Sequence, residues 1–477
     1  MSGTAVVGLL AVAAIVFAVA GIVYSRRAVG NLEDYITARG SMGGAATAAT
    51  LVASGMGAWI LFGPVEAATW GGLPAIIGYA LGSALPALAF IALGRRLRKL
   101  MPEGHSLTEY VFHRYGRPMY SLTLIVMVFY MFIFLAAEIT GMALIASLVA
   151  GVPLWTTALI VLAATLAYTT YGGLRASIFT DKVQTILIVP LLATLLAGGY
   201  VLLGGTAPTM SGLAESAPEL LGLGYLPGLE GGATFLIALV AANLFHQGYW
   251  QRIYAARDER AMTGGFLASA VVIIPIVFAM GLFGLAAVGL GRAETPSVAL
   301  FSVLLDAMPP VLVLALVLLG FLLVMSSADT LINGLASIVA VDAKRAMPGT
   351  SASTLLRLSR CSTLLMAIPL LVIASQGYSV LYLFLVADLV CAAAVFPVFL
   401  GLFSERYTGL AATISTLAGL FAGWLIFPNP AMTEGSLFFS FVAALGVSVV
   451  VSFAAVALTS RRFDMKSLAS SVRYIED

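Results

Sequence analysis

Charged residues are scarce in this chain. They make up 10% of its 477 residues, whereas a soluble globular protein carries about 25%. The 24 basic and 22 acidic residues nearly balance at a net charge of +2, so the chain has no basic field to attract nucleic acid. These shortages exclude an ordinary soluble enzyme, a disordered protein and a nucleic-acid binder.

Cysteine is also rare. Cys361 and Cys391 are the only two in the sequence, which is too few for a disulfide framework, and no Cys/His spacing indicates zinc. The phosphate-binding, nucleophile-elbow and metalloprotease motifs of common enzymes are missing as well. Because the sequence offers neither a nucleophile–base pair nor a metal cluster, we expect no enzymatic activity.

Long apolar runs dominate the sequence instead. Hydrophobic residues make up 61% of it, and the mean hydropathy is +1.04. A helix that crosses a bilayer needs about 20 apolar residues, so we predict an all-α polytopic membrane protein embedded in the lipid bilayer. About 13 such runs occur, near residues 3–24, 42–70, 72–94, 119–150, 154–171, 180–204, 232–253, 262–290, 308–340, 355–376, 379–402, 408–427 and 436–460.

The basic residues predict the orientation. Arg26 and Arg27 follow the first run and no positive charge precedes it, which indicates a membrane helix with its N-terminus outside rather than a signal peptide. Given thirteen spans, Arg292 is the only one of the 24 basic residues that falls outside. We therefore expect a multi-pass protein of the plasma (bacterial inner) membrane with a cytoplasmic C-terminus.

Acidic residues interrupt several spans. Glu66, Glu138, Asp329 and Asp388 fall within predicted spans and Asp181 begins another, whereas no Lys or Arg lies deep in any span. An ionisable residue at the bilayer centre costs roughly 2.5–3.5 kcal/mol on insertion scales, so each marks a candidate functional site. These acids are either protonated or bind cations. Alternatively, Glu66 reaches the interface, and Glu138 and Asp388 bond neighbouring helices.

Residues 324–334 gather oxygen atoms on one turn. Ser326, Asp329 and Thr330 are spaced i, i+3 and i+4, so they share one face of a helix, with Ser327 beside them. Hydroxyl and carboxylate oxygens suit a hard monovalent cation. The alternative is that the hydroxyls bond back to carbonyls of their own helix.

Two spans carry helix-weakening glycines. Gly55 and Gly57 interrupt the span 42–70, and Gly248 interrupts the span 232–253. Transporters use such breaks near the midplane to bind ions through freed carbonyls, although small residues also serve close packing. The two spans begin five spans apart, which predicts a five-plus-five inverted-repeat core with broken first helices.

This repeat predicts how the chain is divided. It gives an extra N-terminal helix and cytoplasmic loop (1–41), a first repeat of five helices (42–204), an external loop (205–231), a second repeat (232–402), two C-terminal helices (403–460) and a cytoplasmic tail (461–477).

Several motifs together resemble the sodium:solute symporter family. The stretch Y-T-T-Y-G-G-L-R-A-S-I-F-T-D-K-V-Q-T at 168–185 is similar to one typical of that family, and weaker matches lie at 106–116, 251–256 and 326–327. The resemblance covers residues 30–405. It implies thirteen or more spans around a five-plus-five core, and sodium entry coupled to uptake of a small organic solute.

The resemblance implies Na⁺ as the bound ion. Its main site consists of the carbonyls of Ala53, Met56 and Leu323 and the hydroxyls of Ser326 and Ser327. Leu323 stands where the family often has Ala, a change that a carbonyl ligand tolerates.

A second cation site is also implied. Its residues are Asp181, which is also the implied cytoplasmic exit residue, with Ser326, Asp329 and Thr330. Asp329 stands where a hydroxyl is usual in the family, which leaves sodium and a proton open at this position.

The solute stays open between two branches of the family. A-S-G-M-G-A-W at 53–59 resembles the sodium/proline branch, except that Gly55 replaces an acid and Gly57 a serine, whereas G-Y-W-Q-R at 248–252 resembles the urea-transporting branch. We expect a midplane pocket for a small polar solute, an amino acid such as proline or a urea-like molecule. Its candidate residues are Gly55, Gly57, Trp59, Glu138, Asn243, His246, Gln247 and Asp388.

The resulting hypothesis is a secondary active symporter that works as a monomer by alternating access. The main alternative is a proton-coupled symporter on the same fold that uses Asp329 or Asp181 as the carrier. A solute sensor would need an attached signalling module, which we do not expect, and a channel would lack saturable coupled uptake.

Overall fold

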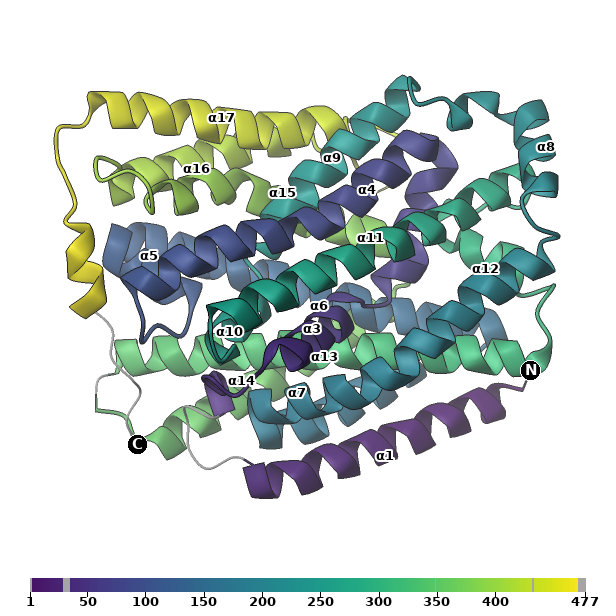
Figure 1. Ribbon diagram of the computed structural model, residues 1–477, viewed down its shortest axis with the longest axis horizontal. Helices are drawn as coiled ribbons and strands as arrows, with labels where there is room; N and C mark the ends of the chain where they lie inside the picture. The colour runs from purple at the N-terminus through teal and green to yellow at the C-terminus, as the bar shows by residue number, and fades with distance from the viewer. Residues whose placement is uncertain (1, 29–34, 348, 431–432, 471–477) are drawn as a thin grey trace.

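The computed structural model describes residues 2–28, 35–347, 349–430 and 433–470, and every regular element among them is a helix. The helices run side by side along the long axis of the molecule (Figure 1). They are α1 (Gly3–Ala28), α3 (Gly44–Gly55), α4 (Trp59–Leu100), α5 (Leu107–Tyr115), α6 (Arg117–Ala150), α7 (Leu154–Leu202), α8 (Ala207–Ser216), α9 (Leu226–Asn243), α10 (Gln247–Ala255), α11 (Glu259–Gly289), α12 (Ala299–Leu304), α13 (Pro310–Ala346), α14 (Ala352–Ala374), α15 (Val380–Leu400), α16 (Gly409–Trp424) and α17 (Leu437–Leu458). Short 3-10 turns lie at Pro218–Leu221 (η1), Pro296–Val298 (η2) and Met465–Ser470 (η3).

Ten of the described helices are long and apolar enough to cross a membrane, and the apolar α16 is somewhat shorter. Two of the ten are too long for one crossing. α4 has 42 residues and α7 has 49, and at 1.5 Å per residue each exceeds about 60 Å, twice the thickness of a bilayer core of about 30 Å. Each of these helices covers two predicted spans. With α3 leading into α4 and α9 into α10, the helices correspond to the thirteen predicted segments.

Glycines mark the points where the two long helices change direction. Gly72 in α4 has φ 61° and ψ −155°, and Gly173 in α7 has φ 55° and ψ −148°. Side-chain-bearing residues rarely adopt this conformation. A Cβ atom would also collide with Leu220 at the first position and with Tyr35 at the second. The break at Gly173 falls within 172–179, the stretch expected between two spans, and the break at Gly72 falls at the boundary of the predicted spans 42–70 and 72–94.

Short helices occupy the segments expected as loops. α8 and η1 lie within 205–231, and α5 precedes α6. These helices have four to ten residues, which is less than a hydropathy scan for spans detects.

The centre of the bundle is formed by α6, α13 and α15. The most apolar window of α13 is 72% buried, against 17% for α14, so α13 is surrounded by protein while α14 presents most of its surface outward. α13 packs against α3, α6 and α7, and α15 packs against α6 and α9. α1 lies along one edge of the molecule and α17 along the opposite edge (Figure 1).

Candidate functional site

The first helix break lies between α3 and α4. α3 ends at Gly55, and Met56 is extended (φ −100°, ψ 99°) before α4 begins at Trp59. Carbonyls in the last turn of a helix lose their intrahelical donors. The indole Nε1 of Trp59 donates to the carbonyl of Gly55 at 3.1 Å, while the carbonyls of Ala53 and Met56 belong to the same freed turn.

A buried carboxylate from α6 caps this break. The backbone N–H of Ala58 and the hydroxyl of Ser327 each donate to Oε2 of Glu138 at 2.7 Å. Oε1 of Glu138 has no hydrogen-bond partner among the described residues. A Cβ atom at residue 57 would collide with this carboxylate, so Gly57 makes room for Glu138 at the start of α4.

The five residues predicted for the main sodium site come from two packed helices. Ala53 and Met56 lie at the end of α3, and Leu323, Ser326 and Ser327 lie on α13, which packs against α3. All five are at most 1% exposed. The hydroxyl of Ser327 also donates to the carbonyl of Leu323 at 3.1 Å. These carbonyl and hydroxyl oxygens are the ligand types that a hard monovalent cation prefers.

Asp181 of α7 faces the same stretch of α13. Its Oδ1 accepts from the hydroxyl of Ser326 at 2.5 Å, and its Oδ2 accepts from Arg252 Nη2 at 3.0 Å and from the hydroxyl of Thr50. The same Nη2 of Arg252 donates to Thr330 at 2.8 Å. The guanidinium therefore bridges α7 and α13 among the residues predicted for a second cation site.

The expectation that the bundle interior holds no basic side chain is wrong at Arg252. Its side chain is fully buried and paired with the fully buried Asp181. Arg252 lies near the end of an apolar run, and this position predicted that it would be on the cytoplasmic side of the membrane. α10, which follows the break at 244–246, is instead buried along almost its whole length, and the pairing with Asp181 lets the charge of Arg252 be buried.

Asp329 of α13 is surrounded by hydroxyls of α7. Its carboxylate accepts from Tyr168 at 2.7 Å, from Ser177 at 2.7 Å and from Thr180 at 3.1 Å. Asp329 is fully buried. Asp181, Asp329 and Arg252 thus form an interior group of two carboxylates and one guanidinium.

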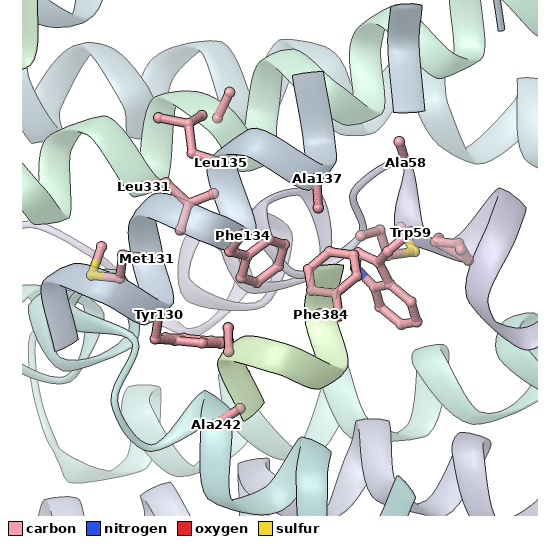
Figure 2. Close-up of a cluster of buried hydrophobic side chains, with 14 of the residues drawn as sticks. Ala58, Trp59, Tyr130, Met131, Phe134, Leu135, Ala137, Ala242, Leu331 and Phe384 are labelled. Atoms are coloured by element: carbon pink, nitrogen blue, oxygen red, sulfur yellow. The ribbon is translucent and has the colours of Figure 1, made fainter. Parts of the chain in front are cut away.

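A cavity opens beside the first break. Of the eight residues predicted for the solute pocket, four line it: Gly55, Trp59, Asn243 and Asp388. Figure 2 shows Trp59 from α4, Tyr130 and Phe134 from α6 and Phe384 from α15 gathered in this region. The cavity is thus bounded by the broken helices and by α6 and α15.

The other four predicted pocket residues do not line this cavity. Gly57 and Glu138 meet at the break itself. His246 Nδ1 accepts from the N–H of Gly248 at 3.1 Å and so caps α10. Gln247 Nε2 donates to the carbonyl of His105 at 2.8 Å, so this side chain tethers α10 to the segment before α5.

Most of the aromatic wall was not expected from the sequence. Tyr79, Tyr130, Phe134, Tyr249 and Phe384 line the cavity. Each lies in an apolar run, where a ring that faces a cavity has the same sequence signature as one that faces lipid or core. Their spacing gave no signal, because they come from four different helices.

Known proteins share both the sequence pattern and the fold. The family model described as the sodium:solute symporter family matches residues 35–419. The spermidine transporter DUR31 of Candida albicans is 26% identical over 85% of this chain and 77% of its own length. The sodium/pantothenate symporter of Haemophilus influenzae is 27% identical over 62% of this chain and 63% of that relative.

A solved structure extends the likeness over almost the whole chain. A Na⁺-coupled sialic acid symporter in a substrate-bound outward-open state superposes with a TM-score of 0.74, covering 97% of this chain and 98% of the other, at 17% identity. At this identity the likeness shows the fold. The all-α inverted-repeat architecture with broken first helices, expected from the sequence, is confirmed.

Proposed function

The chain belongs to the sodium:solute symporter family, and from this premise we propose that it is a sodium-coupled symporter that imports a small polar organic solute. The similar proteins are named for different solutes, spermidine, pantothenate and sialic acid, so family membership alone does not select one. The observation that carries the proposal is the freed end of α3 beside a cavity, with α3 packed against α13, the helix that carries Ser326 and Ser327.

In this proposal the five predicted oxygens hold the sodium ion. The carbonyls of Ala53, Met56 and Leu323 and the hydroxyls of Ser326 and Ser327 supply neutral ligands, and the carboxylate of Glu138 adds negative charge beside them. A cation shared by these groups holds the end of α3 against α13.

Met56 links the ion to the solute. It is one of the predicted sodium ligands and also lines the cavity, next to Gly55. When the ion fixes the end of α3, this wall of the cavity is already ordered, and the solute loses less entropy on binding. Coupling then follows by linkage, since each ligand favours the arrangement that binds the other.

The membrane potential can drive accumulation through such coupling. One sodium ion moving inward across about 100 mV releases about 2.3 kcal/mol, before its concentration gradient is counted. Since about 1.4 kcal/mol corresponds to a factor of ten, this supports roughly fifty-fold accumulation of the solute.

A proton-coupled symporter on the same fold is the second candidate, and the charge balance of Asp181, Arg252 and Asp329 supports it. Asp181 is paired with Arg252, whereas Asp329 is bonded to the hydroxyls of Tyr168, Ser177 and Thr180. A proton on Asp329 leaves this interior group neutral overall. Uptake would then depend on pH without depending on sodium. The predicted second sodium site consists of Asp181, Ser326, Asp329 and Thr330. A sodium ion there would require Arg252 to share or release its hydrogen bonds with Asp181 and Thr330.

We also propose a plasma-membrane location with the N-terminus outside and the C-terminus in the cytoplasm, and function as a monomer. α1 begins at one end of the bundle and η3 lies at the other (Figure 1), as an odd number of crossings requires. A solute sensor on the same fold would bind the same ligands without moving them, and uptake into proteoliposomes distinguishes the two.

The first test of the sodium proposal is thermal stability of the detergent-purified protein in NaCl and in KCl at equal ionic strength. A ligand that binds the folded state at 100 times its Kd stabilises it by about 2.7 kcal/mol. We expect a saturable rise of the melting temperature with sodium, which Ser327→Ala abolishes.

Ser448→Ala is the matched control, because Ser448 is a buried helical serine of α17 that bonds only within its own helix. It should keep the sodium-dependent rise. If sodium has no effect and a pH-dependent shift disappears in Asp329→Asn, the sodium proposal fails and proton coupling replaces it.

A further inference from the structure

The cavity contains a carboxylate with no partner. Asp388 of α15 lines the cavity and is only 2% exposed. Within the part of the chain that the structure describes, its side chain makes no hydrogen bond and no ion pair. A carboxylate removed from water without a donor or a cation is costly. A positively charged group bound in the cavity would remove this cost.

The walls around Asp388 are aromatic. The rings of Phe134 and Phe384 lie 4.7 Å apart between centroids, and those of Trp59 and Tyr79 lie 5.9 Å apart. Figure 2 shows the side chains of Trp59, Phe134 and Phe384 near one another. The faces of aromatic rings attract cations, and rings grouped around a site are the usual means of holding an ammonium group. Tyr130 and Tyr249 also line this cavity.

No basic side chain lines the cavity among the described residues. Its remaining polar residues, Ser83, Asn243 and Ser269, are uncharged. The nearby Arg252 is engaged by Asp181 and Thr330 outside the cavity lining. The charge of the cavity is therefore set by Asp388 alone. An anionic group bound in the cavity would be repelled by the carboxylate of Asp388, and no basic lining residue would offset this repulsion.

We propose that the solute is an organic cation, whose amine, quaternary ammonium or guanidinium group pairs with Asp388 while its apolar part lies against the rings of Trp59, Tyr79 and Phe134. This rests on the proposed transport function and narrows its solute class. Neutral solutes such as urea lack the charge that Asp388 pairs with. A zwitterion such as proline also brings a carboxylate for which the cavity has no basic partner.

The test is a binding measurement on the purified protein in NaCl by titration calorimetry. The cations are choline, putrescine and agmatine, and dimethylbutanol serves as the neutral carbon isostere of choline. Proline, urea and pantothenate represent the zwitterionic, neutral and anionic alternatives. We expect at least one cation to bind at least about tenfold tighter than every uncharged, zwitterionic or anionic probe.

Two variants of Asp388 and one control variant locate the effect. Asp388→Asn keeps the size of the side chain and should lose the preference for the cation by about tenfold or more. Asp388→Glu keeps the charge and should retain most of it. Ser448→Ala, a neutral change of a buried serine on α17 outside the cavity lining, should bind as the wild type does. The sodium-dependent rise in melting temperature checks in each variant that the protein is folded and that the ion site is intact.

Two results overturn the organic-cation assignment while leaving symport in place. One is a wild-type protein that responds to sodium but binds none of the three cations, or binds proline, urea or pantothenate more tightly. The other is unchanged cation binding in Asp388→Asn. Loss of the sodium response itself, in the wild type, counts against the proposed function instead.

Discussion

The contact between Gly57 and Glu138 joins three helices at a single point. Glu138 comes from α6, it accepts the first free N–H at the start of α4, and it accepts the hydroxyl of Ser327 from α13. The absence of a side chain at residue 57 is what allows the carboxylate this close. The break is therefore held by a specific pair of residues and not only by the low helix propensity of glycine.

Gly57→Ala should destabilise the protein and weaken its response to sodium. The added methyl group would overlap the Glu138 carboxylate, and inserting a methyl into a packed interior costs about 1–3 kcal/mol. The measurement is the melting temperature in NaCl and in KCl. Gly264→Ala is the control, because a Cβ atom there meets no other atom within 4 Å.

A second substitution tests the cause. Glu138→Ala removes the group that the new methyl strikes, so Gly57→Ala should cost much less in the Glu138→Ala background than in the wild type. Equal costs in both backgrounds would show that glycine is needed at the break for its backbone freedom alone.

Only part of the candidate site could be predicted from the sequence. Ser326, Asp329 and Thr330 could be placed on one face because their spacing is local. The partners of Asp329 lie about 150 residues earlier in the chain, on α7. Likewise, the burial of Arg252 depends on where α10 packs. Such pairings between distant segments have no signature in a single sequence.

At the scale of helices, the short α5 shows how local signals position the elements around the site. Ser106 and Glu109 form a reciprocal capping box at its start, and His105 N donates to Oε2 of Glu109 at 2.6 Å. α5 is not among the helices that span the membrane. The side chain of Gln247 on α10 also donates a hydrogen bond to the carbonyl of His105, just before α5. The capped start of α5 therefore helps to position α10, the second half of the second broken helix.

Glu109→Gln should lower the melting temperature at neutral pH but not in acid. Burial raises the pKa of Glu109, yet the hydrogen bond and charge of His105 outweigh it and hold the pKa below its ordinary value of 4.5. Because folding lowers the pKa of Glu109, its carboxylate stabilises the fold fully when the pH is above its pKa in the unfolded chain. This stabilisation is lost as the pH falls through its pKa in the folded protein. A cap of this kind contributes on the order of 1 kcal/mol.

A pH series of melting temperatures checks this prediction. The difference between wild type and Glu109→Gln should shrink as the pH falls below 4.5. Glu215→Gln, on the exposed face of α8, should show no such difference at any pH. A constant difference for Glu109→Gln would mean that shape, and not charge, makes the cap.

Helices were more predictable than their junctions. Apolar runs of about 20 residues gave the thirteen segments, because the bilayer sets their length. Gly55 and Gly57 indicated where the first helix of the first repeat breaks, whereas the second break lies at 244–246 and Gly248 itself is helical in α10. The breaks at Gly72 in α4 and Gly173 in α7 fall where the sequence predicts one span to end and the next to begin. The segment boundaries of the two repeats stay predictions.

At the scale of the whole molecule, the predicted ion site and the cavity share one structural element. The freed end of α3 contributes Ala53 and Met56 to the predicted ion site, and Gly55 and Met56 to the cavity. α13, whose apolar window is the most buried among the ten candidate membrane spans, carries the other three predicted ion ligands. Under the proposed function, an ion bound between α3 and α13 would therefore influence a solute in the cavity through the end of α3.

The direct test of this coupling is the affinity of the tightest-binding probe in NaCl and in KCl, at fixed pH and equal ionic strength, for wild type and Ser327→Ala. We predict that sodium tightens binding about 5- to 150-fold, the usual range for coupled sites. The probe should tighten sodium binding by the same factor, and Ser327→Ala should remove both effects. Equal probe affinities in NaCl and KCl for the wild type would contradict sodium-coupled symport.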